Sequence, residues 1–279
     1  MICVENLHLR ARVVRQIRAF FDSRGFLEVD TPVRIAAPAP EPHIDCPAAP
    51  PAFLRASPEL QMKKLLARGL DRIYQMGPCF REGERGSRHQ PEFTMLEWYR
   101  ADSDYLEILS DVEALVAEVL ELPTPFTRLT VREAYARYAG WDPFARFDAD
   151  RFDFDMAAKI EPSLPKTPVF LMDYPPQAAS LSKLRGDVAE RFELYVNGIE
   201  LANAFTELTD AAEQRRRFEA ARAERRALGE ADYPLDEEFL SLLPSMPPSG
   251  GVALGVDRLV MLAAGASRID RVMAFSERC

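Results

Sequence analysis

The spacing of apolar residues predicts both helices and strands along this chain. From Leu7 to Arg24 the apolar positions fall on one helical stripe, and Gly25 can end that helix in the left-handed conformation. The next residues, Phe26 to Val29, predict a strand that Pro32 stops. Helical spacing recurs in two further segments, Pro58–Ala67 and Tyr105–Leu120.

Shorter apolar or alternating segments predict strands, at Arg72–Met76, Phe93–Tyr99 and Val169–Met172. The pair Asn197-Gly198, between apolar runs, predicts a two-residue hairpin turn. Two segments are harder to assign. The proline-rich residues 36–51 favour a surface loop or a reduced hairpin, and residues 142–165 are poorly periodic. Strands joined mostly by hairpins, with helices between them, favour an α+β fold in which helices pack on an antiparallel sheet.

Composition limits the class of protein. With 279 residues, 47% apolar and 28% charged, the chain can bury a large core and fits one large domain or two small ones. No apolar run approaches the ~20 residues that span a bilayer, and the first nine residues lack the apolar stretch of a secretory signal. We therefore expect a soluble, cytoplasmic protein without a membrane partner.

Cysteine and charge patterns narrow the choice further. Four cysteines stand far apart, with no histidine at ligand spacing, so we expect reduced thiols and no sulfur-bound metal: Cys3, Cys46, Cys79 and Cys279. The net charge of −9 argues against a chain that mainly grips nucleic-acid backbone. Residues 214–226 carry six arginines among Glu and Ala, which favours a solvated helix face. Docking of an acceptor on that stretch is the less favoured alternative.

The first group of candidate functional residues combines Arg81 with the strand 93–99. Alternation along a strand puts Phe93, Met95, Glu97 and Tyr99 on one face. A flat aromatic ring suits a nucleobase, a carboxylate suits an ammonium, and an arginine on a neighbouring strand suits a phosphate. The alternative is a half-buried strand whose glutamate pairs with a surface lysine.

The second group lies on the predicted hairpin. Pairing Val196 with Ile199 would put Tyr195 opposite Glu200 and Glu193 opposite residue 202, so that the two carboxylates share one face. Magnesium that bridges nucleotide phosphates would relieve their repulsion. Residues 203 and 207 have the opposite parity, so a bulge near residue 201 or 202 is required if all of them line one site. The alternative is a solvated hairpin with two exposed glutamates.

The third group runs from Ser249 to the helix that follows Gly255. Small residues leave room for a ligand over a strand, and Gly255 allows a tight turn. Arg258 falls in the first turn of the next helix, where it reinforces an anion site. A glycine-rich turn alone is weak evidence of function.

These segments together resemble motifs 1, 2 and 3 of class II aminoacyl-tRNA synthetases. Motif 1 corresponds to the first helix and Phe26–Pro32, motif 2 to Phe-Arg with His-x-Pro-Glu-Phe-Thr-Met-Leu-Glu, and motif 3 to Gly-Val-Asp-Arg. Ala-Ser-Pro-Glu-Leu at 56–60 and Asn-Gly-Ile-Glu-Leu-Ala-Asn-Ala-Phe-Thr-Glu-Leu resemble the lysine branch. The sequences of these motifs are most similar to those of the truncated lysyl-tRNA synthetase paralogues that attach (R)-β-lysine to elongation factor P. The resemblance implies one catalytic domain over residues 1–279 and no anticodon-binding domain.

The resemblance also implies roles for individual residues. Those implied to bind ATP are Arg81, Glu84, His89, Phe93, Glu200 and Arg258, with Arg81 and Arg258 catalytic as well. Those implied to bind the amino acid are Ser57, Glu59, Glu97, Tyr99, Asn203, Glu207 and Ala253. Glu193 and Glu200 are implied to bind magnesium. One position departs from the synthetase motif Phe-Arg-x-Glu, because Gly83 stands at the glutamate and Glu84 follows it.

The implied activity is that of a ligase. It uses ATP and Mg²⁺ to activate lysine or (R)-β-lysine as an adenylate, and then transfers it to a lysine of elongation factor P. A homodimer through motif 1 is implied, and tRNA is not an expected partner. Two alternatives remain open: a minimal lysyl-tRNA synthetase, and a non-catalytic paralogue, against which the presence of the phosphate arginines and magnesium carboxylates argues.

Overall fold

The computed structural model describes residues 3–42 and 44–276, and Cys279 therefore lies outside the described residues. The chain divides into two compact units. Unit 1 comprises residues 1–102, 209–249 and 254–279, and unit 2 comprises residues 103–208 and 250–253. The strand β12 (Ser249–Gly255) contributes residues to both. The expectation of a single catalytic domain stays a prediction.

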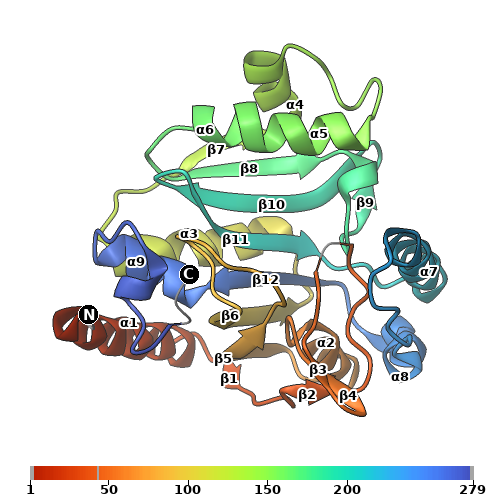
Figure 1. Cartoon of the computed structure of the whole chain (residues 1–279), viewed down its shortest axis with the longest axis horizontal. Helices are drawn as coiled ribbons and strands as arrows, with labels where there is room; N and C mark the ends of the chain where they lie inside the picture. The colour runs from red at the N-terminus through yellow and green to blue at the C-terminus, as the bar shows by residue number, and fades with distance from the viewer. Residues whose placement is uncertain (1–2, 43, 277–279) are drawn as a thin grey trace. The chain divides into compact units, whose positions relative to one another are not determined.

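Unit 1 contains the elements nearest to both ends of the chain (Figure 1). Its helices are α1 (Val4–Asp22), α2 (Glu59–Ala67), α7 (Ala211–Leu228), α8 (Glu237–Leu242) and α9 (Val256–Ala263), with short 3₁₀ turns η4 (Leu243–Ser245) and η5 (Ile269–Arg271). Its strands are β1 (Leu27–Glu28), β2 (Arg34–Ile35), β3 (Ala48–Ala49), β4 (Ala52–Leu54), β5 (Arg72–Phe80) and β6 (Glu92–Ala101).

The first helix is the one that the apolar stripe predicts. Val13, Ile17, Phe20 and Phe21 are its buried residues. Gly25 follows with φ of +71°, the left-handed conformation that glycine adopts without steric cost. The strand β1 then pairs in parallel with β5, so the predicted strand is confirmed, although it is short.

The central hairpin of unit 1 is regular. β5 and β6 are antiparallel and in register from Arg72 opposite Arg100 to Phe80 opposite Glu92. No bulge interrupts β6, so the predicted alternation along residues 93–99 is confirmed.

The proline-rich segment is more ordered than a surface loop. β2, β4 and β3 form a small antiparallel sheet, and Ala37, Pro38, Pro40 and Cys46 are buried. A separate small core of Cys46, Ala56 and Tyr233, with Ile44 and Phe53 packed on it, holds the segment in place. Of the two predicted alternatives, the reduced hairpin is confirmed at β3 and β4, whereas the four buried residues do not fit a surface loop, because apolar residues of the segment pack near a tyrosine that is distant in the sequence.

Unit 2 contains the neighbouring strands β11-β10-β8-β7 of the nine-stranded sheet, and the short strand β9 also pairs with β10. Its strands are β7 (Thr127–Thr130), β8 (Val169–Tyr174), β9 (Leu184–Arg185), β10 (Val188–Val196) and β11 (Ile199–Thr206). Its helices are α3 (Tyr105–Leu120), α4 (Val131–Ala134), η1 (Tyr135–Ala139), α5 (Ala149–Asp155), η2 (Met156–Ile160), α6 (Glu161–Ser163) and η3 (Pro176–Ala178).

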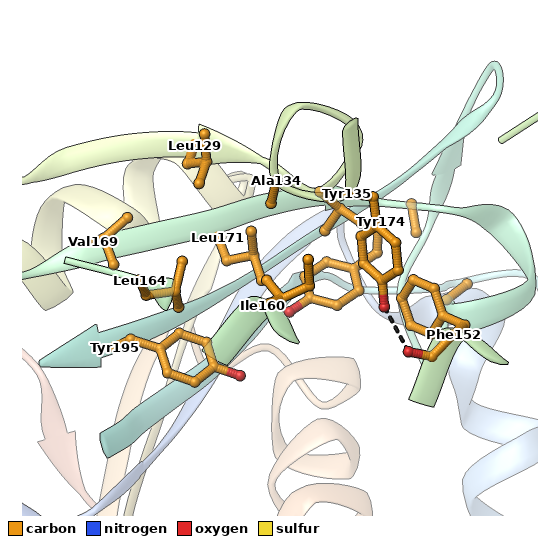
Figure 2. Close-up of a cluster of buried hydrophobic side chains, with 13 residues drawn as sticks. Leu129, Ala134, Tyr135, Phe152, Ile160, Leu164, Val169, Leu171, Tyr174 and Tyr195 are labelled. Carbon is orange, nitrogen blue, oxygen red and sulfur yellow. Dashed lines mark hydrogen bonds between the residues drawn. The ribbon is translucent and has the colours of Figure 1, made fainter. Parts of the chain in front are cut away.

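The poorly periodic residues 142–165 form most of a helical layer over β8 (Figure 1). A π-helical turn, η2, interrupts the helices of this segment, which explains why no single helical period is visible in its sequence. Figure 2 shows the apolar cluster beneath this layer, with Tyr135, Phe152 and Ile160 from the helices and Leu171 from the sheet. The Tyr135 hydroxyl donates to the Phe152 carbonyl at 2.6 Å.

The hairpin of β10 and β11 contains the predicted turn and the predicted bulge. Asn197 and Gly198 have φ of +53° and +70°, as a type I′ turn requires. Tyr195 pairs with Glu200 and Leu194 with Ala202, so one extra residue is accommodated between them. The bulge changes one expected pairing: Glu193 lies opposite Asn203, not opposite residue 202.

The fold class agrees with the expectation of an α+β protein with mostly antiparallel strands. Only two strand pairs, β1 with β5 and β7 with β8, are parallel among the described pairings. Across residues 3–42 and 44–276, no helix is both long and apolar enough to cross a membrane.

Candidate active site

The phosphate-binding candidate Arg81 follows β5 directly. Its guanidinium lies 5.3 Å from the centre of the Phe93 ring, and Nη1 lies 3.4 Å from Glu84 Oε1. Gly83 has φ of +75°, so a glycine suits the turn that brings Glu84 back toward Arg81. The departure from Phe-Arg-x-Glu thus has a structural reason, because the extra residue makes a turn and Glu84 becomes the carboxylate beside the arginine.

His89 and Arg258 lie together in unit 1. Arg258 Nη2 is 2.6 Å from His89 Nε2, and because arginine only donates, Nε2 accepts and the histidine proton is on Nδ1. Burial lowers the pKa of His89, and the positive charge of Arg258 lowers it further. His89 is therefore neutral, and it lies beside the cationic Arg258 at the start of α9. This pair suits an anionic ligand.

Asp257, in motif 3, forms hydrogen bonds with residues of motifs 1 and 2. Its carboxylate accepts from Arg10 of α1 at 2.5 Å and from the backbone N–H of Thr94 in β6 at 2.6 Å. Arg10 also donates to the Thr94 hydroxyl at 2.8 Å. Asp257 is 2% exposed, so water screens this network little, and it fixes α9 against β6 beside Phe93 and Arg258.

Glu97 is the central acid of the amino-acid candidates in unit 1. It is 2% exposed, and its two oxygens accept from the Tyr99 hydroxyl at 2.6 Å and the Ser57 hydroxyl at 2.8 Å. Burial raises the pKa of Glu97 to about 8, and the negative charge of Glu59 adds to the rise. A buried carboxylate with only neutral donors is a favourable site for a substrate ammonium.

Glu59 already has a cation. It forms an ion pair with Lys63 one turn further along α2, and Lys63 is 1% exposed. The Glu59 backbone N–H also donates to the Ser57 hydroxyl at 2.9 Å. Ser57 and Glu59 line a pocket with Ile35 of β2 and with residues of the proline-rich segment: Pro38, Ala39, Glu41 and Cys46.

The arginine-rich helix α7 does not present a free basic surface. Arg216 and Arg217 pair with Glu213, Arg222 and Arg226 pair with Asp232, and Arg215 pairs with Glu237. The expectation of a solvated face is confirmed for most of these arginines, and a docking surface on them stays a less favoured prediction.

Arg225 is the exception on this helix, because it is fully buried. It donates to the carbonyls of Glu41 and Ile44 at 2.9 and 3.0 Å and forms an ion pair with Asp45. The Asp45 carbonyl accepts in turn from the N–H of Glu82 at 2.7 Å. Arg225 therefore connects the wall of the pocket with the residue that follows Arg81.

The candidates of unit 2 lie on β10 and β11. Because of the bulge, Glu193, Glu200 and Asn203 have their side chains on the same face of the hairpin. Glu193 Oε1 accepts from Arg191 at 2.5 Å and Oε2 accepts from the Tyr195 hydroxyl at 2.7 Å. Glu207 follows β11 and forms an isolated bridge with Ser182.

The donor set of unit 2 fits magnesium in kind. Mg²⁺ prefers oxygen ligands and is usually held by one or two carboxylates together with substrate phosphates. Glu193 and Glu200 supply two carboxylates, and each oxygen of Glu193 keeps a lone pair beyond its hydrogen bond. Among the described residues no group of three acidic, histidine or cysteine side chains is placed to hold an ion, so nucleotide phosphates would have to complete the coordination.

The glycine-rich strand β12 serves packing as well as ligand space. A Cβ atom on Gly250 would lie 2.5 Å from Ile108 Cγ1 and 2.6 Å from the Asp104 carbonyl, so this glycine allows the close approach of α3. Gly255 has φ of −77°, so the expected tight turn does not require a glycine conformation there. Ala253 is half-buried.

Sequence reasoning missed four residues of these networks: Arg10, Lys63, Arg191 and Arg225. For Arg191 a signal existed, since an arginine inside an apolar strand must have a buried partner. In the sequence, Arg10 and Arg225 resemble ordinary polar residues of a helix, because their partners are distant in the sequence.

Comparison with known proteins agrees with this geometry. The family of class II tRNA synthetases (D, K and N) matches residues 3–278, so the chain belongs to that family. The chain is also 41% identical to an Elongation factor P--(R)-beta-lysine ligase of Proteus mirabilis (strain HI4320) and 41% identical to that of Edwardsiella ictaluri (strain 93-146). In both cases the match covers 98% of this chain and 95% of the relative.

Proposed function

We propose that this protein activates (R)-β-lysine with ATP and transfers it to a lysine side chain of elongation factor P. The observation that carries the proposal is the buried Glu97, an acid without a cation among its hydrogen-bond donors, on the same strand as Phe93 and close in sequence to Arg81. Class II synthetases use ATP, and the relatives named above are ligases for this amino acid and this acceptor.

In the first step the substrate carboxylate attacks the α-phosphorus of ATP, and pyrophosphate leaves. No nucleophile from the protein is required. Arg81 binds the α-phosphate and stabilises the charge that gathers there, and the Phe93 ring stacks on the adenine. Arg258 and His89 bind the other phosphates, and Glu84 contacts the nucleotide beside Arg81. Most of the remaining rate enhancement comes from holding the two substrates in line.

Glu193 and Glu200 would hold magnesium, which neutralises charge on the phosphates when it is bound. This assignment rests on the kind of donor and on the shared face of the hairpin. It gives the second hairpin a role that a solvated hairpin would not have.

Different residues bind the differently charged groups of the amino acid. Glu97 and Glu207 take the ammonium of the side chain, Tyr99 and Glu59 contact the other end, and Asn203 binds the carboxylate. Ser57 and Ala253 shape the pocket.

In the second step the acceptor amine attacks the carbonyl of the adenylate, and AMP leaves. The amine must be neutral when it attacks, so it must lose its proton near the site. We further propose a homodimer through α1 and β1, where Val4 and Leu27 are 63% and 53% exposed, and a cytoplasmic location. Sedimentation of the purified chain tests the dimer.

The proposal is tested by pyrophosphate exchange with α-lysine and (R)-β-lysine, followed by transfer to purified elongation factor P or to lysine tRNA. We expect exchange that favours (R)-β-lysine, and a mass gain of one β-lysyl group on elongation factor P. Transfer to tRNA instead would identify a minimal lysyl-tRNA synthetase. Absence of exchange with both amino acids would indicate a non-catalytic paralogue.

A further inference from the structure

We propose that Arg191 is a positioning residue that fixes the orientation of the Asn203 side-chain amide, so that the Asn203 NH₂ group faces away from Arg191 and is free to bind the substrate carboxylate. This inference rests on the proposed function, and it assigns a role to a residue outside the synthetase motifs. Arg191 and Asn203 both belong to unit 2 and lie on the paired strands β10 and β11.

The contacts of Arg191 use all three of its nitrogen atoms. Nε donates to the Asn203 side-chain oxygen at 3.2 Å, Nη1 donates to the Ala178 carbonyl at 2.8 Å, and Nη2 donates to Glu193 at 2.5 Å. The guanidinium also lies 4.3 Å from the centre of the Tyr174 ring. A planar group held at three points and stacked on a ring cannot turn without losing several contacts.

Arginine has donors and no acceptor, and this decides the orientation of Asn203. The amide atom that faces Nε must be the oxygen, because an NH₂ group there would place donor against donor. The NH₂ group of Asn203 therefore points the other way. An N–H donor in that direction suits a carboxylate and would repel an ammonium. Arg191 therefore determines which end of the zwitterionic substrate Asn203 binds.

Burial around Arg191 stabilises this orientation of the Asn203 amide. Its side chain is 15% exposed, and that of Glu193 is 11% exposed, so water cannot easily replace the lost contacts. Tyr195 holds the second oxygen of Glu193, and the apolar cluster of Figure 2, which includes Tyr174 and Tyr195, packs beside the network.

The test compares Arg191→Lys with the matched control Arg185→Lys. Arg185 is on the neighbouring strand β9, is 60% exposed and pairs with Glu190, so the control makes the same change away from Asn203. Lysine at 191 keeps the positive charge beside Glu193 but cannot make the three fixed donations of a guanidinium.

Two measurements separate positioning from a general structural effect. One is the KM for (R)-β-lysine in pyrophosphate exchange. The other is the inhibition constant of 1,4-diaminopentane, which is β-lysine without its carboxylate. We expect Arg191→Lys to raise the KM for (R)-β-lysine by about tenfold, the usual cost of one lost hydrogen bond to a charged group. Inhibition by the diamine and the KM for ATP should stay within twofold of wild type, and Arg185→Lys should change none of the three.

Asn203→Asp gives an independent check. Aspartate is a better partner for Arg191, so this variant should fold at least as stably as wild type, yet it removes the NH₂ donor and should lose (R)-β-lysine while it still binds the diamine. An equal change for β-lysine and the diamine in Arg191→Lys, or no change in either, would overturn the inference. If wild type itself shows no amino-acid-dependent exchange, the proposed function fails instead, and the comparison of variants is not reached.

Discussion

Each unit buries a glutamate that accepts a hydrogen bond from the tyrosine two residues further along the same strand. In unit 1 these are Glu97 and Tyr99, at 2.6 Å, and in unit 2 they are Glu193 and Tyr195, at 2.7 Å. The pattern Glu-x-Tyr puts both side chains on one face of a strand, so the shared bond follows from the local sequence. The second donor comes from elsewhere and differs: a serine hydroxyl for Glu97 and a guanidinium for Glu193.

The same local pattern therefore gives two kinds of acid. Glu97 lacks a cation among its donors and burial raises its pKa, so it is mostly protonated near neutral pH, and a positive ligand would favour its ionised form. The charge of Glu193 is already balanced by Arg191. Glu193 is therefore suited to bind a further cation only together with nucleotide phosphates.

The largest effect is expected at the end of the hairpin that carries Glu97. Arg81→Ala should lower pyrophosphate exchange by ~10²-fold or more, because we propose that the arginine acts where negative charge gathers on the transferring phosphoryl group. Circular dichroism should show an intact fold. Arg72→Ala, at the other end of β5, is the control and should keep near-normal exchange. A folded Arg81→Ala protein with wild-type exchange would contradict the assignment.

A smaller effect is expected on the choice of amino acid. By resemblance to full-length lysyl-tRNA synthetases, Ala253 and Ser57 replace a glycine and an alanine, so we expect the methyl of Ala253 to crowd the α-amine of α-lysine. Ala253→Gly should move the preference toward α-lysine, more so with Ser57→Ala. A methyl-sized misfit is worth ~1 to 3 kcal/mol, or roughly 10- to 200-fold in discrimination.

The measurement is the ratio of exchange efficiencies for the two lysines, with the KM for ATP as the control. The structure adds a consequence, because Ser57→Ala also removes a donor from Glu97. An unchanged ratio in the double variant would show that selectivity resides elsewhere.

A further effect is expected in the magnesium requirement. Glu193→Gln and Glu200→Gln should each raise the magnesium concentration for half-maximal exchange by roughly tenfold, because each removes one carboxylate from a paired site. Glu190→Gln on the same strand is the control, since Glu190 pairs with Arg185. Titrations of both variants that superimpose on wild type would favour a hairpin without a metal role.

The last effect is expected in stability and not in activity, as a dependence of the free energy of unfolding on pH. The pKa of Glu97 rises from an ordinary 4.5 to about 8 in the folded protein, so the folded state binds the proton more tightly than the unfolded state. The contribution of Glu97 to the free energy of unfolding should therefore fall as the pH rises from about 4.5 to about 8, by at most ~1.4 kcal/mol per pH unit. Glu97→Gln should remove this slope.

Urea unfolding of wild type and Glu97→Gln at several pH values measures the difference. The difference between the two proteins should be flat above pH ~8, where Glu97 is ionised in both states. Parallel curves from pH 5 to 8 would show that Glu97 is ionised throughout.

Much of the site could be predicted from sequence because its geometry is local. The faces of β6 follow from the two-residue period of strands. The turn follows from the positive φ that Asn197 and Gly198 tolerate, and the need for a bulge follows from the strand period once the residues of the hairpin are assumed to line one site. Even the location of the bulge could be inferred, because only an extra residue brings Glu200 and Asn203 to the same face.

What sequence could not supply are the partners that come from distant residues. Burial of the proline-rich segment depends on Tyr233 and on Arg225, which lie more than 170 residues further along the chain. No local pattern marks Arg225, since its neighbours on the same helix are exposed and paired at the surface. The ion pair of Arg191 with Glu193 is local, yet the Asn203 orientation it sets requires the register across the bulge.

The buried Arg225 has a consequence for anyone who would graft this pocket onto another scaffold. Among the described residues 38–42 and 44–46 there is no helix or strand, and the Arg225 guanidinium, which binds backbone carbonyls of this segment, helps to fix its path. Backbone carbonyls do not depend on side-chain identity, so the sequence of the segment can drift while its path is kept. A transplanted loop would lose that path unless the helix bearing Arg225 were moved with it.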